Sequence, residues 1–317
     1  MKNCNICPNN CLLEKRSICG RNNVDENVVE ATAIAIDPIE KKPLYHFYPG
    51  SQTLSVGTLG CNLRCLNCQN HSIAQPENRD MVPVRCLSQE ALVNTALENN
   101  LNSISWTYNE PSIYPEWIIS TARIAEEYDI RTILVSNGYT SSSTLESLVG
   151  YVSAVNIDLK GDADFYENIC RARLKNVQNS IEYYYDNNVH IELTNLLIPS
   201  LNDDADSVTS LCEYVHGISD SITVHFSAFH PDYKLRHLPP TREESVLNAC
   251  SIARDTGLRY VYPGNIRPSY DDNTYCEHCE DVLIERNYYS VENYITADGK
   301  CPHCGSIAED ILFKGLS

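Results

Sequence analysis

The sequence predicts an α/β fold: a partial (β/α) barrel with a small cysteine-rich metal-binding segment at each end. Apolar runs rich in β-branched residues alternate with helical patterns, as in parallel strands joined by crossover helices. The runs lie near residues 53–58, 103–108, 131–136, 153–158, 189–197, 222–229 and 258–262. In the helical pattern over 111–128, Ile113, Trp117, Ile124 and Tyr128 should share one face. We expect three parts: an N-terminal segment (1–50), the barrel (51–268) and a tail (269–317).

Composition predicts a cytoplasmic enzyme that keeps its thiols reduced. The 317 residues include 42 acidic and 24 basic ones, a formal net charge of −18. Nucleic-acid affinity depends on Lys and Arg contacts with phosphate, so this charge disfavours a nucleic-acid partner. We expect no secretory leader and no membrane span, since no run reaches the roughly eighteen apolar residues that a span needs. The 15 cysteines then indicate metal ligation and core thiols, not a disulfide framework.

Three cysteines follow the first barrel strand with the spacing CxxxCxxC: Cys61, Cys65 and Cys68. Three thiolates bind three irons of a 4Fe-4S cluster and leave the fourth iron open. An open iron can chelate the amine and carboxylate of S-adenosylmethionine and pass it an electron. The alternative is a structural zinc site, which needs a fourth ligand, and the nearest one is His71.

Polar side chains also follow the next two strands, where the active sites of such folds lie. Asn109 and Glu110 could orient an ammonium group, and the alternative is a helix cap. Ser136 and Asn137 could bind a ribose, and the alternative is an ordinary turn.

The fourth strand ends in two charges. Asp158 and Lys160 leave it on the same face, where a charge is costly unless it is paired or bound to a ligand. We interpret both as ligand contacts, and Lys160 also as a catalytic residue. The closing strands add four candidates for contact with the substrate: His225, His230, Tyr233 and Asn265. We predict that His230 and Tyr233 are catalytic and that His225 is a core residue.

Both ends of the chain carry a cysteine quartet. The tail has two CxxC pairs separated by twenty-one residues: Cys276, Cys279, Cys301 and Cys304. This spacing is typical of a ribbon that binds one tetrahedral zinc or iron ion. The head has four cysteines within sixteen residues, for which zinc, iron and an auxiliary iron-sulfur cluster are all open: Cys4, Cys7, Cys11 and Cys19. We interpret the other cysteines as core fillers: Cys86, Cys170, Cys212 and Cys250.

The cysteine triad, with the motifs TYNEP (107–111), VSNGY (135–139) and NIDLKG (156–161), resembles the radical SAM superfamily and its activating-enzyme branch. Longer stretches resemble the AmmeMemoRadiSam system radical SAM enzymes: DPIEKKPLYHFYPG (37–50), LLIPSLNDD (196–204), FHPDYK (229–234) and VYPGNI (261–266). The resemblance implies cleavage of S-adenosylmethionine to methionine and a 5'-deoxyadenosyl radical, which abstracts hydrogen from a substrate.

The resemblance also implies roles for individual residues. The triad would ligate the cluster, Asn109 and Glu110 would meet the methionyl amine, and Ser136 and Asn137 the ribose. Asp158 and Lys160 would lie near the sulfonium or the carboxylate. Asn67 is a departure, because relatives usually carry an aromatic residue there that packs against the adenine. We keep Asn67 among the predicted cofactor-binding residues.

The expected substrate is a protein or peptide, because the nearest architectural relatives activate proteins. The resemblance further implies a flavodoxin- or ferredoxin-type electron donor and a Memo-type partner. Within this class, cobalamin-assisted radical C-methylation of a protein is the alternative reaction. The alternative from a different class is an iron-sulfur electron-transfer or scaffold protein that never cleaves S-adenosylmethionine.

Overall fold

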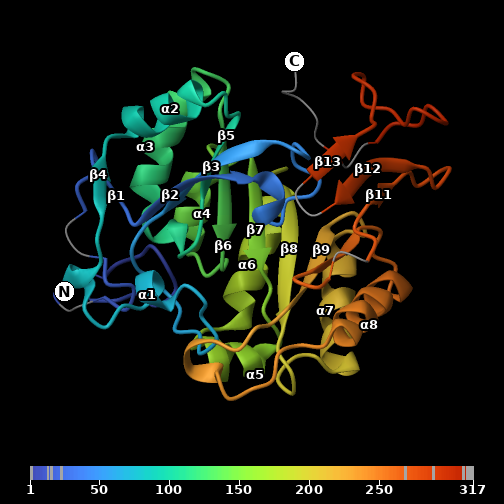
Figure 1. The fold of residues 1–317 in the computed structure, drawn as a ribbon. Helices are drawn as coiled ribbons and strands as arrows, with labels where there is room; N and C mark the ends of the chain where they lie inside the picture. The colour runs from blue at the N-terminus through green and yellow to red at the C-terminus, as the bar shows by residue number, and fades with distance from the viewer. Residues whose placement is uncertain are drawn as a thin grey trace. The chain divides into compact units, whose positions relative to one another are not determined.

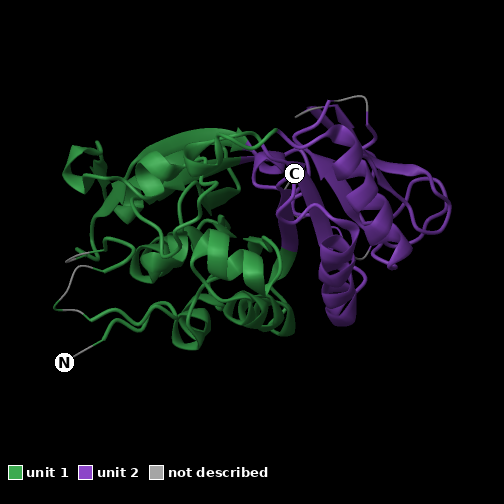
Figure 2. Ribbon diagram, turned by 90° about the horizontal axis from the view of Figure 1, so that it is seen from below, with its two compact units in different colours: residues 1–37, 53–191, 230–239 green, residues 38–52, 192–229, 240–317 purple. Residues whose placement is uncertain are grey.

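The structure, a computed structural model, describes residues 3–12, 14, 17–21, 24–267, 270–287, 290–308 and 311. The chain forms two compact units that interleave along the sequence (Figure 2). Unit 1 comprises residues 1–37, 53–191 and 230–239, and unit 2 comprises 38–52, 192–229 and 240–317. The last six residues of the expected tail, 312–317, lie outside the described residues.

Unit 1 is built on five strands in the order β2-β3-β5-β6-β7 (Figure 1). They are β2 (Ala33–Pro38), β3 (Gln52–Gly57), β5 (Ser103–Trp106), β6 (Arg131–Ser136) and β7 (Ala154–Asp158). β3, β5, β6 and β7 pair in parallel, with Val56 opposite Trp106 and Ser136 opposite Ile157. The carboxyl ends of these four strands therefore meet at one edge of the sheet.

Helices connect the strands of unit 1. They are α1 (His71–Ala74), α2 (Gln89–Glu98), α3 (Pro115–Glu126), α4 (Ser142–Leu148), α5 (Ala163–Phe165) and α6 (Leu174–Asp186). Three further helical turns are the 3₁₀ helices η2 (Arg79–Met81) and η3 (Pro111–Ile113) and the π-helix η4 (Tyr166–Cys170). Ser88 and Ser141 cap α2 and α4, because each hydroxyl accepts a hydrogen bond from a backbone amide of the first turn. A short antiparallel pair joins β1 (Val29–Ala31) and β4 (Arg85–Leu87).

Unit 2 contains three parallel strands in the order β8-β9-β10. Their bounds are β8 (His190–Leu197), which begins at the unit boundary, β9 (Thr223–Ala228) and β10 (Val261–Gly264). α7 (Ala205–Ile218) and α8 (Glu243–Asp255) connect them, and η1 (Ile39–Lys41) belongs to the same unit. The tail adds an antiparallel sheet of β11 (Thr274–Tyr275), β12 (Val282–Asn287) and β13 (Ser290–Asn293).

The α/β class with parallel strands is confirmed, and each of the seven predicted runs overlaps a strand. The helical pattern over 111–128 is only partly right. Pro111 starts a separate 3₁₀ turn, and α3 begins at Pro115 with its own buried face of Trp117, Ile118, Thr121, Ala122 and Ala125. Tyr128 lies beyond the end of α3 and is 53% exposed, so the prediction that it shares a helix face with Trp117 is wrong.

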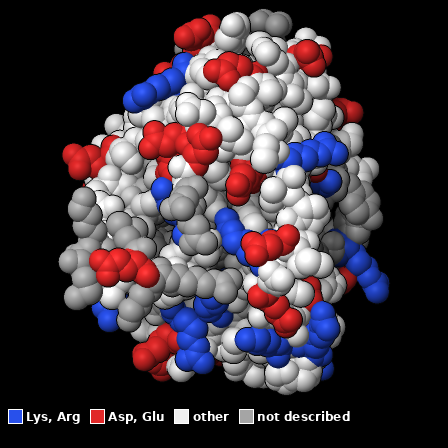
Figure 3. All heavy atoms as spheres, turned by 90° about the vertical axis from the view of Figure 1, so that its left-hand side faces the viewer, with Lys and Arg blue, Asp and Glu red and all other residues white. Residues whose placement is uncertain are grey.

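No helix among the described residues is both long and apolar enough to span a membrane. Figure 3 shows one face of the molecule, on which acidic and basic side chains are interspersed.

Candidate active site and metal centres

The polar motifs predicted from the sequence follow the strand ends of unit 1. The loop that carries the cysteine triad, residues 58–70 (the triad loop), leaves β3, and Asn109 and Glu110 follow β5. Ser136 is the last residue of β6, and Asp158 is the last residue of β7. The parallel register thus gathers all four motifs at the carboxyl edge of the sheet, where such folds place their active sites.

Backbone hydrogen bonds hold the triad loop from two sides. Arg64 N donates to Cys170 O and Leu66 N donates to Ile169 O, both at 3.0 Å, so the loop is fixed against η4. Lys234 N donates to Leu66 O at 3.0 Å from the segment 230–239. π-helical turns are rare and occur frequently at functional sites. The protein itself therefore fixes the path of this loop.

Asn109 anchors the start of the triad loop. Its Nδ2 donates to Gly60 O at 2.7 Å, and its Oδ1 accepts from Thr58 N at 2.9 Å. Asn109 is 8% exposed, so these bonds satisfy a buried amide. The contact with the methionyl amine stays a prediction for this residue.

The sulfur of Cys61 accepts hydrogen bonds from Leu63 N at 3.4 Å and from Asn137 Nδ2 at 3.5 Å. Burial raises the pKa of the Cys61 thiol well above its ordinary value. The same Asn137 amide also donates to Asn62 Oδ1 at 2.9 Å, within the triad loop. Hydrogen bonds to ligating sulfurs orient them and tune the potential of a cluster. Asn137 is thus placed to act on Cys61, whereas its ribose contact remains a prediction.

Glu110 lies at the centre of this edge and is 1% exposed. Its carboxylate accepts from Ser136 Oγ at 2.8 Å, Asn137 N at 2.7 Å and Ser112 N at 3.0 Å. The bond from Ser112 N makes Glu110 the N-cap of η3. Burial raises the pKa of Glu110, and the bonds from Asn137, Ser112 and Ser136 oppose that shift. Both readings of the motif, capping and ligand binding, therefore involve the same buried carboxylate.

Asp158 and Lys160 form an ion pair, with Lys160 Nζ 2.7 Å from Asp158 Oδ2. Burial lowers the pKa of Lys160, but the carboxylate of Asp158 offsets this and holds that pKa well above its ordinary value. Tyr166 OH donates to Asp158 O at 3.0 Å and accepts from Lys160 N at 3.1 Å. This pairing explains how two charges on one face are tolerated at the sheet edge.

Asn67 is buried within the triad loop and is 7% exposed. Its Oδ1 has no hydrogen-bond partner among the described residues. An unsatisfied buried acceptor is costly, and in native proteins it commonly marks a missing ligand or water. Asn67 Oδ1 is thus an acceptor available to a bound group beside the cysteines.

The two predicted catalytic residues of the segment 230–239 differ in their surroundings. The Tyr233 ring stacks on the His71 ring, with centroids 4.5 Å apart and planes 13° apart. Its neighbour Lys234 binds Leu66 of the triad loop, so Tyr233 lies against that loop. His230 is exposed. Asn265, in unit 2, donates from Nδ2 to Ala228 O at 3.3 Å.

The comparisons with known proteins agree with this geometry. The model of the radical SAM superfamily matches residues 55–212, a range that includes the triad and the motifs at 109, 136 and 158. An uncharacterised protein of Methanocaldococcus jannaschii is 38% identical over 320 residues, covering 98% of this chain and 95% of that protein. The chain belongs to the radical SAM superfamily. The pyruvate formate-lyase 1-activating enzyme of Escherichia coli K12 is 21% identical over 218 residues, 64% of this chain and 89% of that enzyme.

Solved structures show the same fold. Streptococcus suis SuiB bound to S-adenosylmethionine aligns with a TM-score of 0.53 at 13% identity, covering 73% of this chain and 53% of SuiB. At this identity the likeness shows the fold alone.

The residues of this radical SAM enzyme fit the cluster and the nucleoside that the superfamily implies. The triad supplies three thiols in one loop, and the mutual repulsion of Cys61, Cys65 and Cys68 contributes to the raised pKa of Cys61, after burial and Glu110. Three thiolates suit a 4Fe-4S cluster with one open iron. The unsatisfied Oδ1 of Asn67 suits a ligand that offers an N–H group, such as the amine of adenine.

We expect the substitution Glu110→Gln to destabilise this radical SAM enzyme. The amide nitrogen would face donors where the carboxylate now accepts from Ser136 and two backbone amides, so at least one buried donor loses its acceptor. The expected loss is roughly 1 to 3 kcal/mol of unfolding free energy, measured by denaturant unfolding. The exposed Glu98→Gln on α2 is the matched control. A stability equal to that of the parent would contradict the structural role of this carboxylate.

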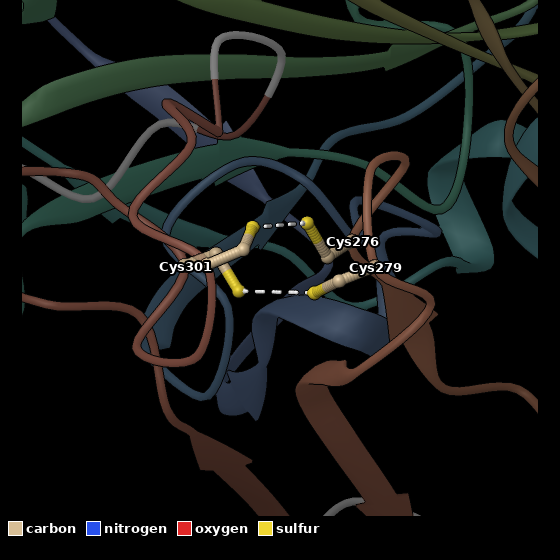
Figure 4. A group of neighbouring side chains, drawn as sticks. Cys276, Cys279 and Cys301 are labelled. Carbon is tan, nitrogen blue, oxygen red and sulfur yellow. Dashed lines mark hydrogen bonds between the residues drawn. The ribbon is translucent and has the colours of Figure 1, made fainter.

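The tail quartet of the enzyme converges on one point (Figure 4). Its four sulfurs lie within 4.8 Å of one another, with 3.7 Å between Cys276 and Cys304 and between Cys279 and Cys301. Four sulfurs at about 2.3 Å from one zinc ion are about 3.8 Å apart, so the geometry fits a single tetrahedral ion. The four predicted ligands are thus brought together as one ion requires, while metal binding itself and the choice between zinc and iron stay predictions.

The two knuckles of the tail have the same backbone pattern. Glu280 N donates to Cys276 O at 2.9 Å, and Gly305 N donates to Cys301 O at 3.0 Å. Both donors have a positive φ, 60° at Glu280 and 76° at Gly305, which closes the turn after each CxxC. Burial opposes ionisation of Cys276, yet hydrogen bonds, chiefly from Ser306, lower the pKa of that thiol to about 6. A thiolate is the form that binds a metal ion.

Sequence reasoning missed Cys170. The sequence places Cys170 among the core fillers, but a hydrogen bond between the thiols of Cys170 and Cys65 is the main cause of the lowered pKa of Cys65. Its carbonyl also accepts from Arg64 N in the triad loop. No spacing pattern links Cys170 to the triad, which lies about a hundred residues earlier.

A buried polar network in unit 2 was also missed. Glu192, at 0% exposure, accepts from His46 N at 2.8 Å and Tyr45 N at 3.0 Å, and lies 2.7 Å from His225 Nε2. The prediction that His225 is a hydrogen-bonded core residue agrees with this arrangement. A carboxylate within the apolar strand at 189–197 was the signal that could have revealed the network.

Proposed function

We propose that this radical SAM enzyme reductively cleaves S-adenosylmethionine to methionine and a 5'-deoxyadenosyl radical that abstracts hydrogen from a protein or peptide. The observation that carries this proposal is the hydrogen-bond chain from Glu110 through Asn137 to Cys61. It joins two strand-end motifs to the triad, so that the sheet edge orients the sulfur of a cluster ligand. A structural thiol site would need no such connection. The name of the related pyruvate formate-lyase 1-activating enzyme supports a protein substrate.

The residues of the sheet edge would have different roles in binding the cluster and S-adenosylmethionine. Cys61, Cys65 and Cys68 would hold the cluster, which when bound supplies the electron and an open iron for the methionyl group. Asn67 Oδ1 would accept from the amine of the adenine, since it has no partner among the described residues. Lys160, kept charged by Asp158, would face the carboxylate.

Tyr233 is the better placed of the two substrate-side residues. Its neighbour Lys234 binds Leu66 of the triad loop, and its ring stacks on His71, the residue that follows this loop. A low-potential electron donor of the flavodoxin or ferredoxin type belongs to the proposal. The Memo-type partner stays a prediction from the resemblance.

The test is an anaerobic assay of the reconstituted full-length enzyme with S-adenosylmethionine and a reductant. We expect equal amounts of methionine and 5'-deoxyadenosine, and a further rise of both when the true substrate is added from proteome fractions of the source organism. Mass-shifted peptides or a glycyl radical signal would then identify the product. Cys86→Ala is the matched control, because Cys86 is exposed on β4 outside the sheet edge. Methylated peptides would favour the methyltransferase alternative, and the absence of 5'-deoxyadenosine would contradict the proposal.

A further inference from the structure

The head segment carries four cysteines but little regular structure. Its described residues between 3 and 28 form no helix or strand, apart from one isolated bridge. All four cysteines are free thiols, and Cys7 and Cys19 are buried, at 8% and 9% exposure. So short a segment cannot bury enough apolar surface to order itself, and a metal centre commonly does so instead.

Hydrogen bonds fold the head segment back on itself. Cys4 N donates to Cys11 O at 2.7 Å, which brings these two residues side by side, and Asn10 N closes the turn between them on Cys7 O at 3.1 Å. Ser17 Oγ lies 3.5 Å from Cys19 Sγ. Asn9 Nδ2 donates to Asn62 O and Arg64 Nη2 donates to Ile18 O, so the neighbours of Cys7 and of Cys19 meet the same short stretch of the triad loop.

The spacing of these thiols differs from that of the tail. Among the described residues, the tail quartet alone has its ligand atoms within 4.8 Å of one another, as one tetrahedral ion requires. The four head cysteines are all described, and their sulfurs do not form such a compact group. In a 4Fe-4S cluster each thiolate binds a different iron, so the ligands surround a larger body than a single ion.

We propose that Cys4, Cys7, Cys11 and Cys19 hold a second 4Fe-4S cluster beside the triad loop. With a thiolate on each of its irons, this cluster has no open position for S-adenosylmethionine and is suited to carry an electron. The inference rests on the head cysteines and goes beyond the proposed function of the triad.

Contacts within unit 1 join the head to the triad loop. Asn9 Nδ2 donates to Asn62 O at 2.7 Å, and Arg64 Nη2 donates to Ile18 O. Gly60 has a φ of 104°, and a Cβ at this position would collide with Cys19 O. The residues directly before and after Cys61 thus touch the head, which places the second cluster next to the first.

The experiment compares the parent with two variants, all of full length and purified without oxygen. Iron, acid-labile sulfide and zinc are counted per chain, because sulfide reports clusters and ignores single ions. We expect about eight irons and about eight sulfides in the parent, beyond the ion of the tail. The triad variant (Cys61→Ala, Cys65→Ala and Cys68→Ala) should keep about four of each, with a reduced paramagnetic signal that S-adenosylmethionine does not shift.

The head variant (Cys7→Ser with Cys11→Ser) should also keep about four irons and four sulfides, and its signal should shift with S-adenosylmethionine. The triad variant decides the question even if the head variant fails to fold, because its head is intact. A triad variant without sulfide, or one zinc held by the head, would overturn the proposal. Failure of the triad's own function would show instead as a parent signal that S-adenosylmethionine does not shift. Cys86→Ala should match the parent in every count.

Discussion

Replacing Cys61, Cys65 and Cys68 with alanine is expected to abolish S-adenosylmethionine cleavage while leaving the enzyme folded. The triad loop keeps its path without the cluster, because Arg64 and Leu66 bind η4 and Asn109 binds Gly60. The thiols are therefore needed for chemistry more than for the fold. Formation of 5'-deoxyadenosine should fall to the level of the reagents alone, and circular dichroism should match the parent.

The decisive measurement is the paramagnetic signal of the reduced parent with and without S-adenosylmethionine. A shift shows that the ligand reaches an open iron, and the triple variant should lack this shifted component. Cys86→Ala, an exposed thiol outside the site, should behave like the parent. Product formation by the triple variant would rule out the triad as the catalytic cluster site.

Replacing Cys301 and Cys304 with serine is expected to release one metal ion and to unfold the tail. The tail core is small, with Leu283, Ile284 and Ile311 as its fully apolar buried members, so the metal must contribute much of its stability. Structural zinc supplies on the order of 10 kcal/mol of folding free energy in small domains. Amide hydrogen exchange over residues 274–308 should rise steeply, whereas exchange in β5 and β6 should not change.

A metal assay provides the count for this second prediction. The serine variant should bind one equivalent less of zinc or iron than the parent, with the sulfide content unchanged. Cys212→Ala, a buried thiol of α7, is the matched control for loss of a cysteine. Protected amides in a tail that has lost its metal would show that the apolar core suffices.

Hydrophobic periodicity predicted the strands well because each lies in a buried parallel sheet. The run at 131–136 became β6 with the same bounds, and the run at 258–262 contributed to β10 at Val261–Gly264. The helix after β5 was harder to predict, because α3 begins at Pro115 and not at Pro111, and this start determines which of its residues face the core. Hydrophobic periodicity cannot locate the start of a new helix when apolar residues occur on both sides of that start.

The sequence also predicted which motifs gather at the sheet edge, because parallel strands bring their carboxyl ends together. The sequence did not predict which side chains form hydrogen bonds with one another. Glu110 accepts from Ser136 and Asn137, two residues that were assigned to a different part of the ligand. Cys170 reaches Cys65 through the turn of η4. Such contacts depend on the three-dimensional path of loops, which spacing along the chain does not encode.

The close approach of Gly60 to Cys19 has a consequence for how the enzyme matures in the cell. Gly60, Asn62 and Arg64 of the triad loop all contact the head, so the two loops pack against each other within unit 1. A side chain at position 60 would push the triad loop away from Cys19 O and loosen this packing. We therefore expect a Gly60→Ala variant to take up iron more slowly than the parent during anaerobic reconstitution, although each site can still be filled without the other.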